Sequence, residues 1–248
     1  RDEGEVYVYG GKVNDVTIHL MLKVCIDTAV DYEIAGNPQY RGLAVVNHPK
    51  TGEPISRHYY PPQNAEDLIK RHELIVTSTR LAGGMIPFTK DIGGDSMNAI
   101  MVTAMLSGNN EYVKRVNEFY EYLRKNDLST ACAMTDVKGD RSLHSSSNMQ
   151  SHPDYYVHVV DKRDDGIIVR GAKVNITATA YCNEILVLPC RNMRKEDKDY
   201  TVCFAVKPNA KGLKHICHPI KYEQSSLEFP VNIPIRMHTE SLLIFDDV

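Results

Sequence analysis

The clearest candidates for metal chemistry are thiol and imidazole side chains near the end of the chain. His215, Cys217 and His218 stand close together in the sequence, and Cys190 or Cys203 could join them as a further ligand. Thiolate and imidazole are ligands that zinc prefers in proteins. The HxCH spacing, however, crowds its ligands onto one short segment. We therefore predict no metal site, and we interpret these histidines as surface residues and these thiols as buried.

Patterns typical of nucleophilic catalysis and of phosphate binding are absent from the sequence. Ser145, Ser146 and Ser147 do not form the G-x-S-x-G turn that exposes a catalytic serine. Cys132 has no basic neighbour in the sequence that would activate it, so we interpret it as a small buried thiol. No GxGxxG or GxxxxGK[ST] loop is present. Residue spacing alone therefore does not identify a reaction.

Composition places the chain among ordinary globular proteins. Of its 248 residues, 42% are hydrophobic and 25% are charged, and the formal net charge is −3. This charge argues against nucleic-acid binding, and no apolar run approaches the ~20 residues that a membrane span needs. The six cysteines contain no CxxC pair, which favours reduced thiols and a cytoplasmic location. Because the chain begins with Arg1, we expect that its natural N-terminus is missing.

Helices are expected to dominate residues 1–127, after a short extended arm at Tyr7–Gly11. Capping residues and apolar spacing predict one helix over Leu20–Ile34, one from the N-cap Asn64, one from the N-cap Asp95 and one over Asn110–Lys125. The last of these helices has an apolar stripe formed by Val113, Val116, Phe119, Tyr120 and Leu123. The ion pairs Glu111–Arg115 and Glu121–Lys125 are expected to support it. Residues 40–62 are predicted to be a loop.

Strands are expected from residue 128 onward. The turn Asp164–Gly166 separates two β-forming runs, Tyr155–Val160 and Ile167–Arg170, which predicts a hairpin. Further strands are predicted over Val174–Tyr181, Glu184–Leu188, Tyr200–Val206 and Ser241–Phe245. We therefore predict an α+β protein with an all-helical domain at residues 1–127 and a small antiparallel β-barrel or sandwich at residues 128–248.

Two long stretches of this sequence carry a family resemblance. They are MTDVKGDR, from Met134 to Arg141, and HPDYYVHVVDKRDDGIIVRGAK, from His152 to Lys173. Together with shorter matches at Lys195–Tyr200, Gly212–His215 and Phe245–Val248, they closely resemble the flavoprotein family of 4-hydroxyphenylacetate 3-hydroxylase and 4-hydroxybutyryl-CoA dehydratase. The resemblance covers nearly the whole chain.

The resemblance implies a fold like that of the acyl-CoA dehydrogenases. In that arrangement a helical domain and a central β domain are followed by a C-terminal helix bundle, which supplies one wall of the flavin pocket and the contacts of a homotetramer. This chain ends where the bundle would begin, so the resemblance also implies that a C-terminal domain is absent from it.

The resemblance further implies which residues bind FAD. The family's flavin loop matches Met134, Thr135, Asp136, Lys138, Gly139, Asp140 and Arg141, and a second flavin-contacting strand matches Asn175, Ile176 and Thr177. Threonine hydroxyls can bond the polar edge of the isoalloxazine ring, and a cation such as Lys138 or Arg141 suits the diphosphate. The alternative for Asp140 and Arg141 is a local ion pair without a ligand.

The sequence departs from both known branches of the family at the substrate side. In the dehydratase branch two cysteines of an iron–sulfur cluster occupy the positions of Pro87 and Asp91, neither of which can supply a thiolate. In the hydroxylase branch an Arg, a Tyr and a His bind the phenol, and the matching positions are approximately Ile92, Ser96 and Cys132. No catalytic residue is therefore identified.

The function implied is that of an FAD-dependent oxidoreductase. The favoured version is a two-component aromatic hydroxylase that takes reduced FAD from a separate flavin reductase and uses O2 to hydroxylate a phenol, because that activity needs no iron–sulfur cluster. One alternative is an acyl-CoA dehydratase or isomerase like 4-hydroxybutyryl-CoA dehydratase and vinylacetyl-CoA isomerase. A second alternative is a non-catalytic relative that acts as a binding module.

Overall fold

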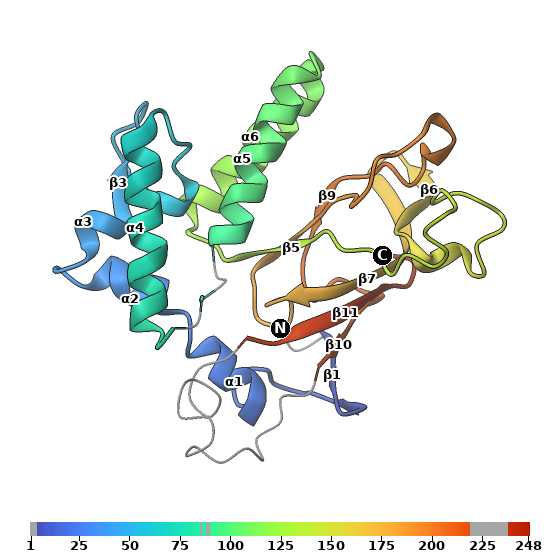
Figure 1. Cartoon of the computed structure of the whole chain (residues 1–248), viewed down its shortest axis with the longest axis horizontal. Helices are drawn as coiled ribbons and strands as arrows, with labels where there is room; N and C mark the ends of the chain where they lie inside the picture. The colour runs from blue at the N-terminus through green and yellow to red at the C-terminus, as the bar shows by residue number, and fades with distance from the viewer. Residues whose placement is uncertain (1–3, 85, 88–89, 219–237) are drawn as a thin grey trace. The chain divides into compact units, whose positions relative to one another are not determined.

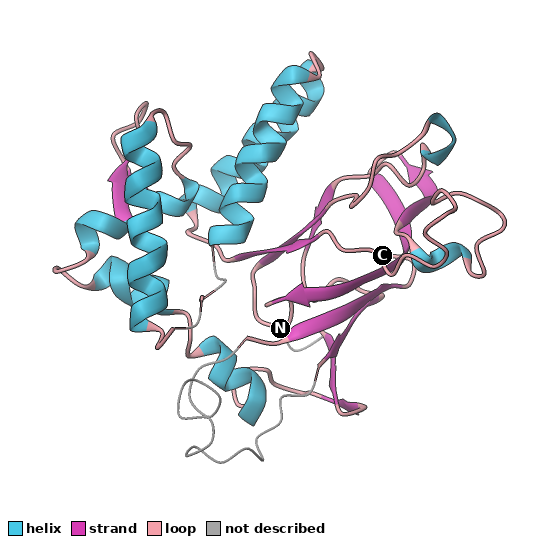
Figure 2. Ribbon diagram, viewed as in Figure 1, coloured by secondary structure: helices cyan, strands magenta, loops and turns pink. Residues whose placement is uncertain are grey.

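A computed structural model of the chain describes residues 4–84, 86–87, 90–218 and 238–248. Their contacts form two compact units (Figures 1 and 2). The β unit comprises residues 4–23, 131–218 and 239–248, and the helical unit comprises the described residues between 24 and 130 together with residue 238. The units divide close to the predicted boundary at residue 127, but residues 4–23 belong with the strands. The division into domains at residues 1–127 and 128–248 stays a prediction.

The helical unit contains most of the helices of the described chain. The first helix, α1, crosses from the β unit, and the others follow in the order of the sequence. Their bounds are α1 Leu20–Ile26, α2 Val30–Gly36, α3 Arg41–Ala44, α4 Ala65–Leu81, α5 Asp91–Leu106 and α6 Asn110–Lys125. Buried apolar residues of α2, α3 and α4 pack into one cluster that includes Val30, Ile34, Ala44 and Leu74.

Two helices confirm their predicted starts. The side chain of Asn64 caps α4 by accepting a hydrogen bond from the backbone N–H of Asp67 at 3.0 Å. Helix α6 begins at Asn110, and Asn109 caps it. The predicted stripe of α6 is buried or half-buried, and its Glu111–Arg115 ion pair forms at 2.8 Å. Local sequence therefore determines these two helices.

The predicted single helix over Leu20–Ile34 is wrong, because the chain breaks between α1 and α2. At the break the Thr28 hydroxyl donates a hydrogen bond to the Cys25 carbonyl at 2.6 Å. A threonine hydroxyl that donates to a preceding backbone carbonyl competes with the backbone hydrogen bonds that would continue the helix. The predicted end of this region is correct, since α2 stops at Gly36.

The predicted start of α5 at Asp95 is also wrong, because the helix begins at Asp91 and runs through Gly93 and Gly94. Both glycines allow close packing. A Cβ on Gly93 would lie 2.5 Å from the Thr130 carbonyl oxygen, and one on Gly94 would overlap the His58 carbonyl. Because the glycines serve tertiary contact, a local pattern misreads them as helix breakers.

The N-terminal region is not all-helical, contrary to the prediction. Within the predicted loop, β3 (Val45–Asn47) and β4 (Pro54–Ser56) form an antiparallel hairpin, followed by the 3-10 turn η1 (Arg57–Tyr59). Gly52 closes the hairpin with φ of +72°, a conformation that glycine adopts readily. Strands of three residues are too short to show alternation in the sequence.

The β unit contains a six-stranded sheet and a three-stranded sheet. The larger has the order β2-β1-β10-β11-β7-β6, and the smaller has the order β5-β8-β9. The bounds are β1 Glu5–Val8, β2 Gly11–Lys12, β5 Thr130–Ala133, β6 His158–Arg163, β7 Gly166–Thr177, β8 Glu184–Val187, β9 Phe204–Val206, β10 Leu213–Cys217 and β11 Glu240–Phe245. Two 3-10 turns, η2 (Pro153–Tyr155) and η3 (Lys195–Asp197), connect them.

The larger sheet is mixed, because β1, which lies outside the β domain predicted for residues 128–248, also joins it. Strand β1 lies parallel to β10, with Val6 opposite His215. The neighbouring β10–β11 and β11–β7 pairs are antiparallel. The parallel pair joins the two ends of the chain, and no turn signal in the sequence marks such a long-range contact.

Several strand predictions are confirmed and others need correction. The hairpin around Asp164–Gly166 forms, as do β8 and β11 near their predicted positions. The strand predicted at Tyr155–Val160 begins only at His158, because η2 includes Tyr155. The two predicted runs between Ile167 and Thr177 form one continuous strand, β7. Alternating inward side chains of β7, β10 and β11 form the core, which includes Val169, Ile176, Leu213, Leu243 and Phe245.

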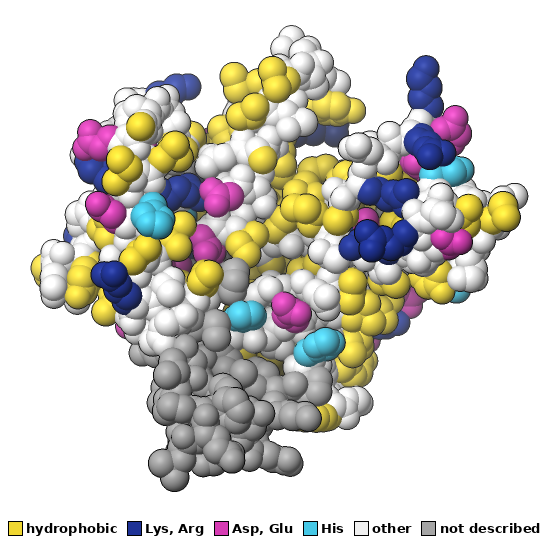
Figure 3. All heavy atoms as spheres, viewed as in Figure 1, with side chains coloured by type: hydrophobic (Ala, Val, Ile, Leu, Met, Phe, Trp, Pro, Cys, Tyr) yellow, Lys and Arg dark blue, Asp and Glu magenta, His cyan; other side chains and the backbone are white. Residues whose placement is uncertain are grey.

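None of the helices in the described residues has the length and apolar character that a membrane crossing requires. Figure 3 shows Lys and Arg side chains interspersed with Asp and Glu on the visible face of the molecule. This mixture agrees with the small net charge of −3.

Candidate functional site

The two segments predicted to contact a flavin lie side by side in the β unit. The backbone N–H of Val174, on β7, donates a hydrogen bond to the Thr135 carbonyl at 2.9 Å. Next to it, Asp136 and Lys173 form an isolated antiparallel bridge. The first part of the loop therefore runs along β7, directly beside the strand residues Asn175–Thr177.

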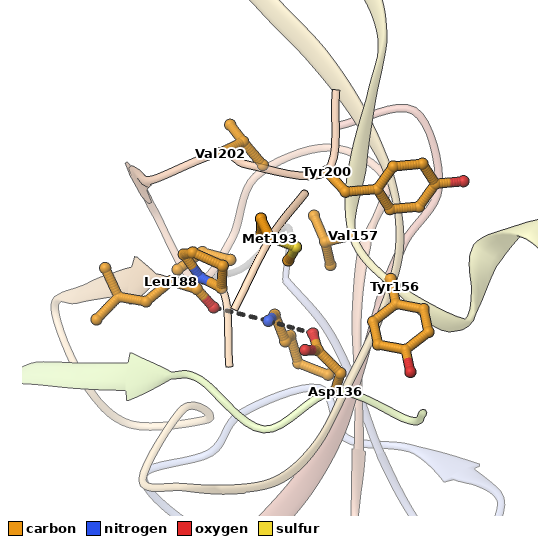
Figure 4. A pocket seen from close by; sticks show the side chains of 10 residues that line it. Asp136, Tyr156, Val157, Leu188, Met193, Tyr200 and Val202 are labelled. Atoms are coloured by element: carbon orange, nitrogen blue, oxygen red, sulfur yellow. Dashed lines mark hydrogen bonds and ion pairs between the residues drawn. The ribbon is translucent and has the colours of Figure 1, made fainter. Parts of the chain in front are cut away.

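A buried ion pair fastens the loop to the strand. The Lys173 ammonium pairs with the Asp136 carboxylate and also donates to the carbonyls of Met134 at 2.9 Å and Leu188 at 2.7 Å. Figure 4 shows two of these bonds as dashed lines. Burial lowers the pKa of Lys173, and the Asp136 charge partly offsets that effect. Both side chains are thus held away from water in one fixed geometry.

A small cavity lies against this ion pair. Its lining combines apolar side chains such as Val157, Met193 and Val202 with two tyrosines and the Asp136–Lys173 ion pair (Figure 4). Within the described part of the chain, Oδ2 of Asp136 is buried without a hydrogen-bond partner, while Oδ1 accepts a hydrogen bond from the Lys173 ammonium. At Asp136 the loop therefore faces the interior of the β unit, and the side chain is buried.

The middle of the loop turns through left-handed backbone. Lys138 has φ of +77° and Gly139 has φ of +25°. A Cβ on Gly139 would overlap the Tyr155 ring and the Gln150 amide, so this position requires glycine. Gln150 braces the turn, because its Oε1 accepts from the Asp140 N–H at 3.0 Å and its Nε2 donates to the Asp140 carbonyl at 2.9 Å. Non-glycine residues with positive φ are uncommon and often lie at binding sites.

Asp140 and Arg141 do not form the local ion pair that was the alternative to ligand binding. The Asp140 carboxylate instead accepts from the hydroxyl of Ser142 at 2.7 Å and from its N–H at 2.9 Å, which lowers the pKa of Asp140. Arg141 is exposed, Lys138 is partly exposed, and neither has an ion-pair partner among the described residues. Two cationic side chains are therefore available on the loop.

The segment that continues from the loop to Ser146 is anchored by Asp197, which lies on η3 between strands β8 and β9 of the smaller sheet. Its carboxylate accepts from the backbone N–H groups of Ser146 at 2.9 Å and Arg194 at 3.0 Å, and it lies 3.2 Å from His144 Nδ1. Burial alone would raise the pKa of Asp197, but these hydrogen bonds outweigh burial and lower it. The loop and the segment that continues from it are thus each held by a buried carboxylate.

The strand beside the loop carries a bulge at Asn175. The register of β7 against β11 shifts between Ser241 and Leu243, and Asn175 has φ of +55°. Bulges of this kind bend a strand and re-aim its side chains, and they are frequent next to active sites. The side chain of Asn175 is exposed and that of Thr177 is half-buried, whereas Ile176 points into the core.

The predicted cofactor residues therefore differ in what they can offer a ligand. Exposed or partly exposed side chains are those of Met134, Thr135, Lys138, Asp140, Arg141, Asn175 and Thr177, with Gly139 contributing backbone. Asp136 and Ile176 are buried and serve packing. The structure brings residues 134–136 and 173–177 together, but the described contacts do not join Lys138–Arg141 to the strand.

Sequence reasoning missed the residues that hold the loop in place. These are Lys173, Gln150, Asp197 and Leu188, which act through bonds between distant segments. Only Lys173 left a signal: in the alternation of β7 it falls on the inward face with Val169, where a lysine is exceptional.

Among the described residues, no group of three or more His, Cys, Asp or Glu side chains is arranged to hold a metal ion. His215 is fully buried, so its interpretation as a surface residue is wrong. It lies on the inward face of β10, where its nitrogens bond Thr179 Oγ1 at 3.0 Å and the Pro208 carbonyl at 2.7 Å. Cys217 is buried as expected, but Cys203 is exposed.

These features define an α+β protein with a braced, cation-bearing loop beside a bulged strand. The family described as "4-hydroxyphenylacetate 3-hydroxylase N terminal" matches residues 1–248. The chain belongs to this family, as its resemblance predicted.

Curated relatives include members of both branches. The chain is 34% identical to 4-hydroxybutyryl-CoA dehydratase/vinylacetyl-CoA-Δ-isomerase of Clostridium aminobutyricum, over 98% of this chain and 50% of that protein. It is 28% identical to the oxygenase component of 4-hydroxyphenylacetate 3-monooxygenase of Thermus thermophilus, over 96% and 48%. The chain spans about half the length of the curated relatives it matches.

Solved structures show the same two branches. The oxygen-tolerant archaeal 4-hydroxybutyryl-CoA dehydratase from N. maritimus matches with a TM-score of 0.88 at 27% identity, covering 100% of this chain and 50% of that one. The oxygenase component of 4-hydroxyphenylacetate 3-monooxygenase complexed with FAD matches with a TM-score of 0.86 at 26% identity, again covering 100% and 50%. The fold is therefore common to both branches.

Proposed function

We propose that the protein containing this chain is an FAD-dependent oxidoreductase, and that its β unit binds the flavin through the loop Met134–Arg141 and the strand residues Asn175–Thr177. One observation carries the proposal: the two segments pack together through Val174 and Thr135, while Lys138 and Arg141 remain available. A relative of closely similar fold was solved with FAD bound.

The residues present suit FAD. Arg141 and Lys138 can neutralise a diphosphate, and the partly exposed Thr135 and Thr177 can hydrogen-bond a flavin ring. Bound FAD would supply the electron transfer that none of these side chains can perform. The role of the chain itself is to hold and orient the cofactor.

The favoured reaction is hydroxylation of a phenol with O2 and reduced flavin delivered by a separate reductase. Several relatives are oxygenase components of monooxygenases. This reaction requires no metal cluster, and the positions of two cluster cysteines in the dehydratase branch are Pro87 and Asp91 here. Asp91 is buried at the start of α5 with its carboxylate bonded to the N–H of Ile92 at 2.9 Å, which is no thiolate site.

The second candidate is an acyl-CoA dehydratase or isomerase. Sequence identity favours it, because the chain is 34% identical to the clostridial dehydratase and 28% identical to the Thermus oxygenase component. On this alternative the substrate is an acyl-CoA, and the cluster of the relatives has been replaced or lost.

The finer features of the proposal follow from the family resemblance. They are an acyl-CoA dehydrogenase-like arrangement with a barrel or sandwich in the β unit, a homotetramer, and a cytoplasmic location. The third candidate, a binding module without catalysis, is excluded by demonstrating turnover.

The test uses the full-length protein that contains this chain. Its visible spectrum is recorded as purified and after titration with FAD, and we expect flavin absorption bands and saturable binding. The reduced holoprotein is then incubated with O2 and a panel of phenols, and separately with 4-hydroxybutyryl-CoA or vinylacetyl-CoA. Product from the phenols selects the hydroxylase, and product from the CoA esters selects the alternative. A protein that takes up no FAD contradicts the proposal.

A further inference from the structure

The ammonium group of Lys173 is saturated by three acceptors from two separate segments. It bonds the Met134 carbonyl, the Asp136 carboxylate and the Leu188 carbonyl. A lysine ammonium has three N–H donors, so none is left for another partner. The three acceptors come from the loop that follows β5 and from the end of β8, while Lys173 itself belongs to β7.

The arrangement fixes the loop at its first residues. A hydrogen bond to the Met134 carbonyl sets the plane of the Met134–Thr135 peptide, because that peptide is rigid. The Thr135 carbonyl is set independently by Val174 N–H. The direction of the Thr135 side chain is thereby determined from both sides.

Lys173 also stands two residues before Asn175, at the start of the bulge. The side chains of β7 point alternately inward and outward. The inward Lys173 and the outward residues beyond it therefore share the backbone of one strand, which fixes their positions relative to each other. A bond from Lys173 to the loop therefore sets the loop relative to the bulge.

We propose that Lys173 is a positioning residue, which holds the loop Met134–Asp136 and the bulged strand in the relative geometry that binds FAD. The proposal rests on the proposed function. Lys173 is buried and all its donors are used inside the protein, so it acts through Thr135 and the strand and does not touch the cofactor.

The test separates positioning from stability by removing the ion pair in two ways. In K173M alone, Asp136 becomes a buried unpaired carboxylate, and the variant can fail to fold for that reason. In the double variant Lys173→Met with Asp136→Leu, both charges are gone and apolar side chains of similar size fill the space. Replacement of a buried ion pair in this way is often neutral for stability.

The matched control is Lys214→Met. Lys214 lies in the same unit on β10 and pairs with Asp246 at 2.8 Å. Its side chain is partly exposed, and its described ion pair does not involve the loop Met134–Arg141. All variants are made in the full-length protein, and FAD affinity, flavin absorption spectrum and melting temperature are measured for each.

We expect the double variant to keep a melting temperature near that of the wild type while its FAD dissociation constant rises at least tenfold and its flavin bands shift or broaden. Lys214→Met keeps the wild-type affinity and spectrum. The proposal is overturned if the double variant binds FAD with the wild-type affinity and spectrum, or if it fails to fold, which would leave Lys173 a role in stability alone. A wild-type protein that binds no FAD overturns the proposed function itself and this proposal with it.

Discussion

Among the described residues, each unit contains one deeply buried lysine paired with an aspartate, and the two pairs differ in how far the acid is exposed. In the helical unit Lys90 is 1% exposed and bonds Asp127 at 2.6 Å, but Asp127 is 44% exposed. In the β unit Lys173 is 2% exposed and its partner Asp136 is 3% exposed. Burial lowers the pKa of both lysines. The side chain of Asp127 is thus partly exposed, although its Oδ1 is buried, whereas that of Asp136 is almost fully enclosed.

The remaining partners of the two lysines differ as well. Lys90 lies 3.9 Å from the centre of the Tyr32 ring, a soft contact that tolerates small displacements. Lys173 bonds two backbone carbonyls, which have fixed directions. A buried lysine can therefore join two helices, as Lys90, just before α5, does with Asp127, two residues beyond the end of α6. It can also set the backbone of a binding loop, as Lys173 does.

The largest expected effect comes from K173M. Loss of the lysine leaves Asp136 buried and unpaired, which costs about 3–5 kcal/mol in the free energy of unfolding. Denaturant unfolding of the full-length protein, followed by a probe in the β unit, measures it. A cost below about 1 kcal/mol would show that water reaches Asp136 and would remove the contrast with Lys90.

A smaller effect is expected from Asp197→Asn, which removes the charge that anchors the segment continuing from the loop. The hydrogen bonds of Ser146 and Arg194 to a charged acceptor weaken, at a cost of about 1–3 kcal/mol. The folded state lowers the pKa of Asp197, so its contribution is fully present above the unfolded-state pKa of about 3.9 and is lost progressively as the pH falls from that value through the lower folded-state pKa. The difference between the unfolding free energies of wild type and variant should therefore be smaller at pH 3 than at pH 7; an equal difference at the two pH values would contradict the account.

Lys90→Met should cost less, about 1–2 kcal/mol, since Asp127 is left partly hydrated. The measurement is the same unfolding experiment with a probe in the helical unit, and FAD affinity serves as the control, which should stay unchanged. A cost equal to that of K173M would mean that exposure of the acid does not distinguish the pairs.

The smallest effect is expected from R141Q on the exposed part of the loop. Stability should stay within about 0.5 kcal/mol, because Arg141 has no ion pair among the described residues. FAD affinity should fall about threefold to tenfold through loss of one cation near the diphosphate, with a weaker dependence on salt. An exposed lysine elsewhere, changed as Lys70→Gln on α4, is the control and should leave affinity unchanged.

Sequence predicted the parts of this molecule that local physics decides. The cap at Asn64, the stripe of α6 and the turn at Asp164–Gly166 all lie within short windows of sequence. The start of α5 was missed because Gly93 and Gly94 meet residues far along the chain, Thr130 and His58. The parallel β1–β10 pair was missed for the same reason.

The candidate site divides in the same way. The family resemblance pointed to the loop and strand, and the structure brings their first residues together. The resemblance did not show that Asp136 and Ile176 face inward. It also did not show that Gln150, Lys173 and Asp197 hold the loop in place. Those facts depend on which distant segments pack together, and the residue types alone do not encode them.

The most direct test of the central claim is hydrogen exchange of the full-length protein with and without FAD, resolved by peptide. The account predicts that FAD slows exchange in peptides that cover residues 134–142 and 174–178, while the α4 peptide at residues 65–81 is unchanged. Protection confined to other segments, or no protection anywhere at saturating FAD, would contradict the assignment of the flavin site to this loop and strand.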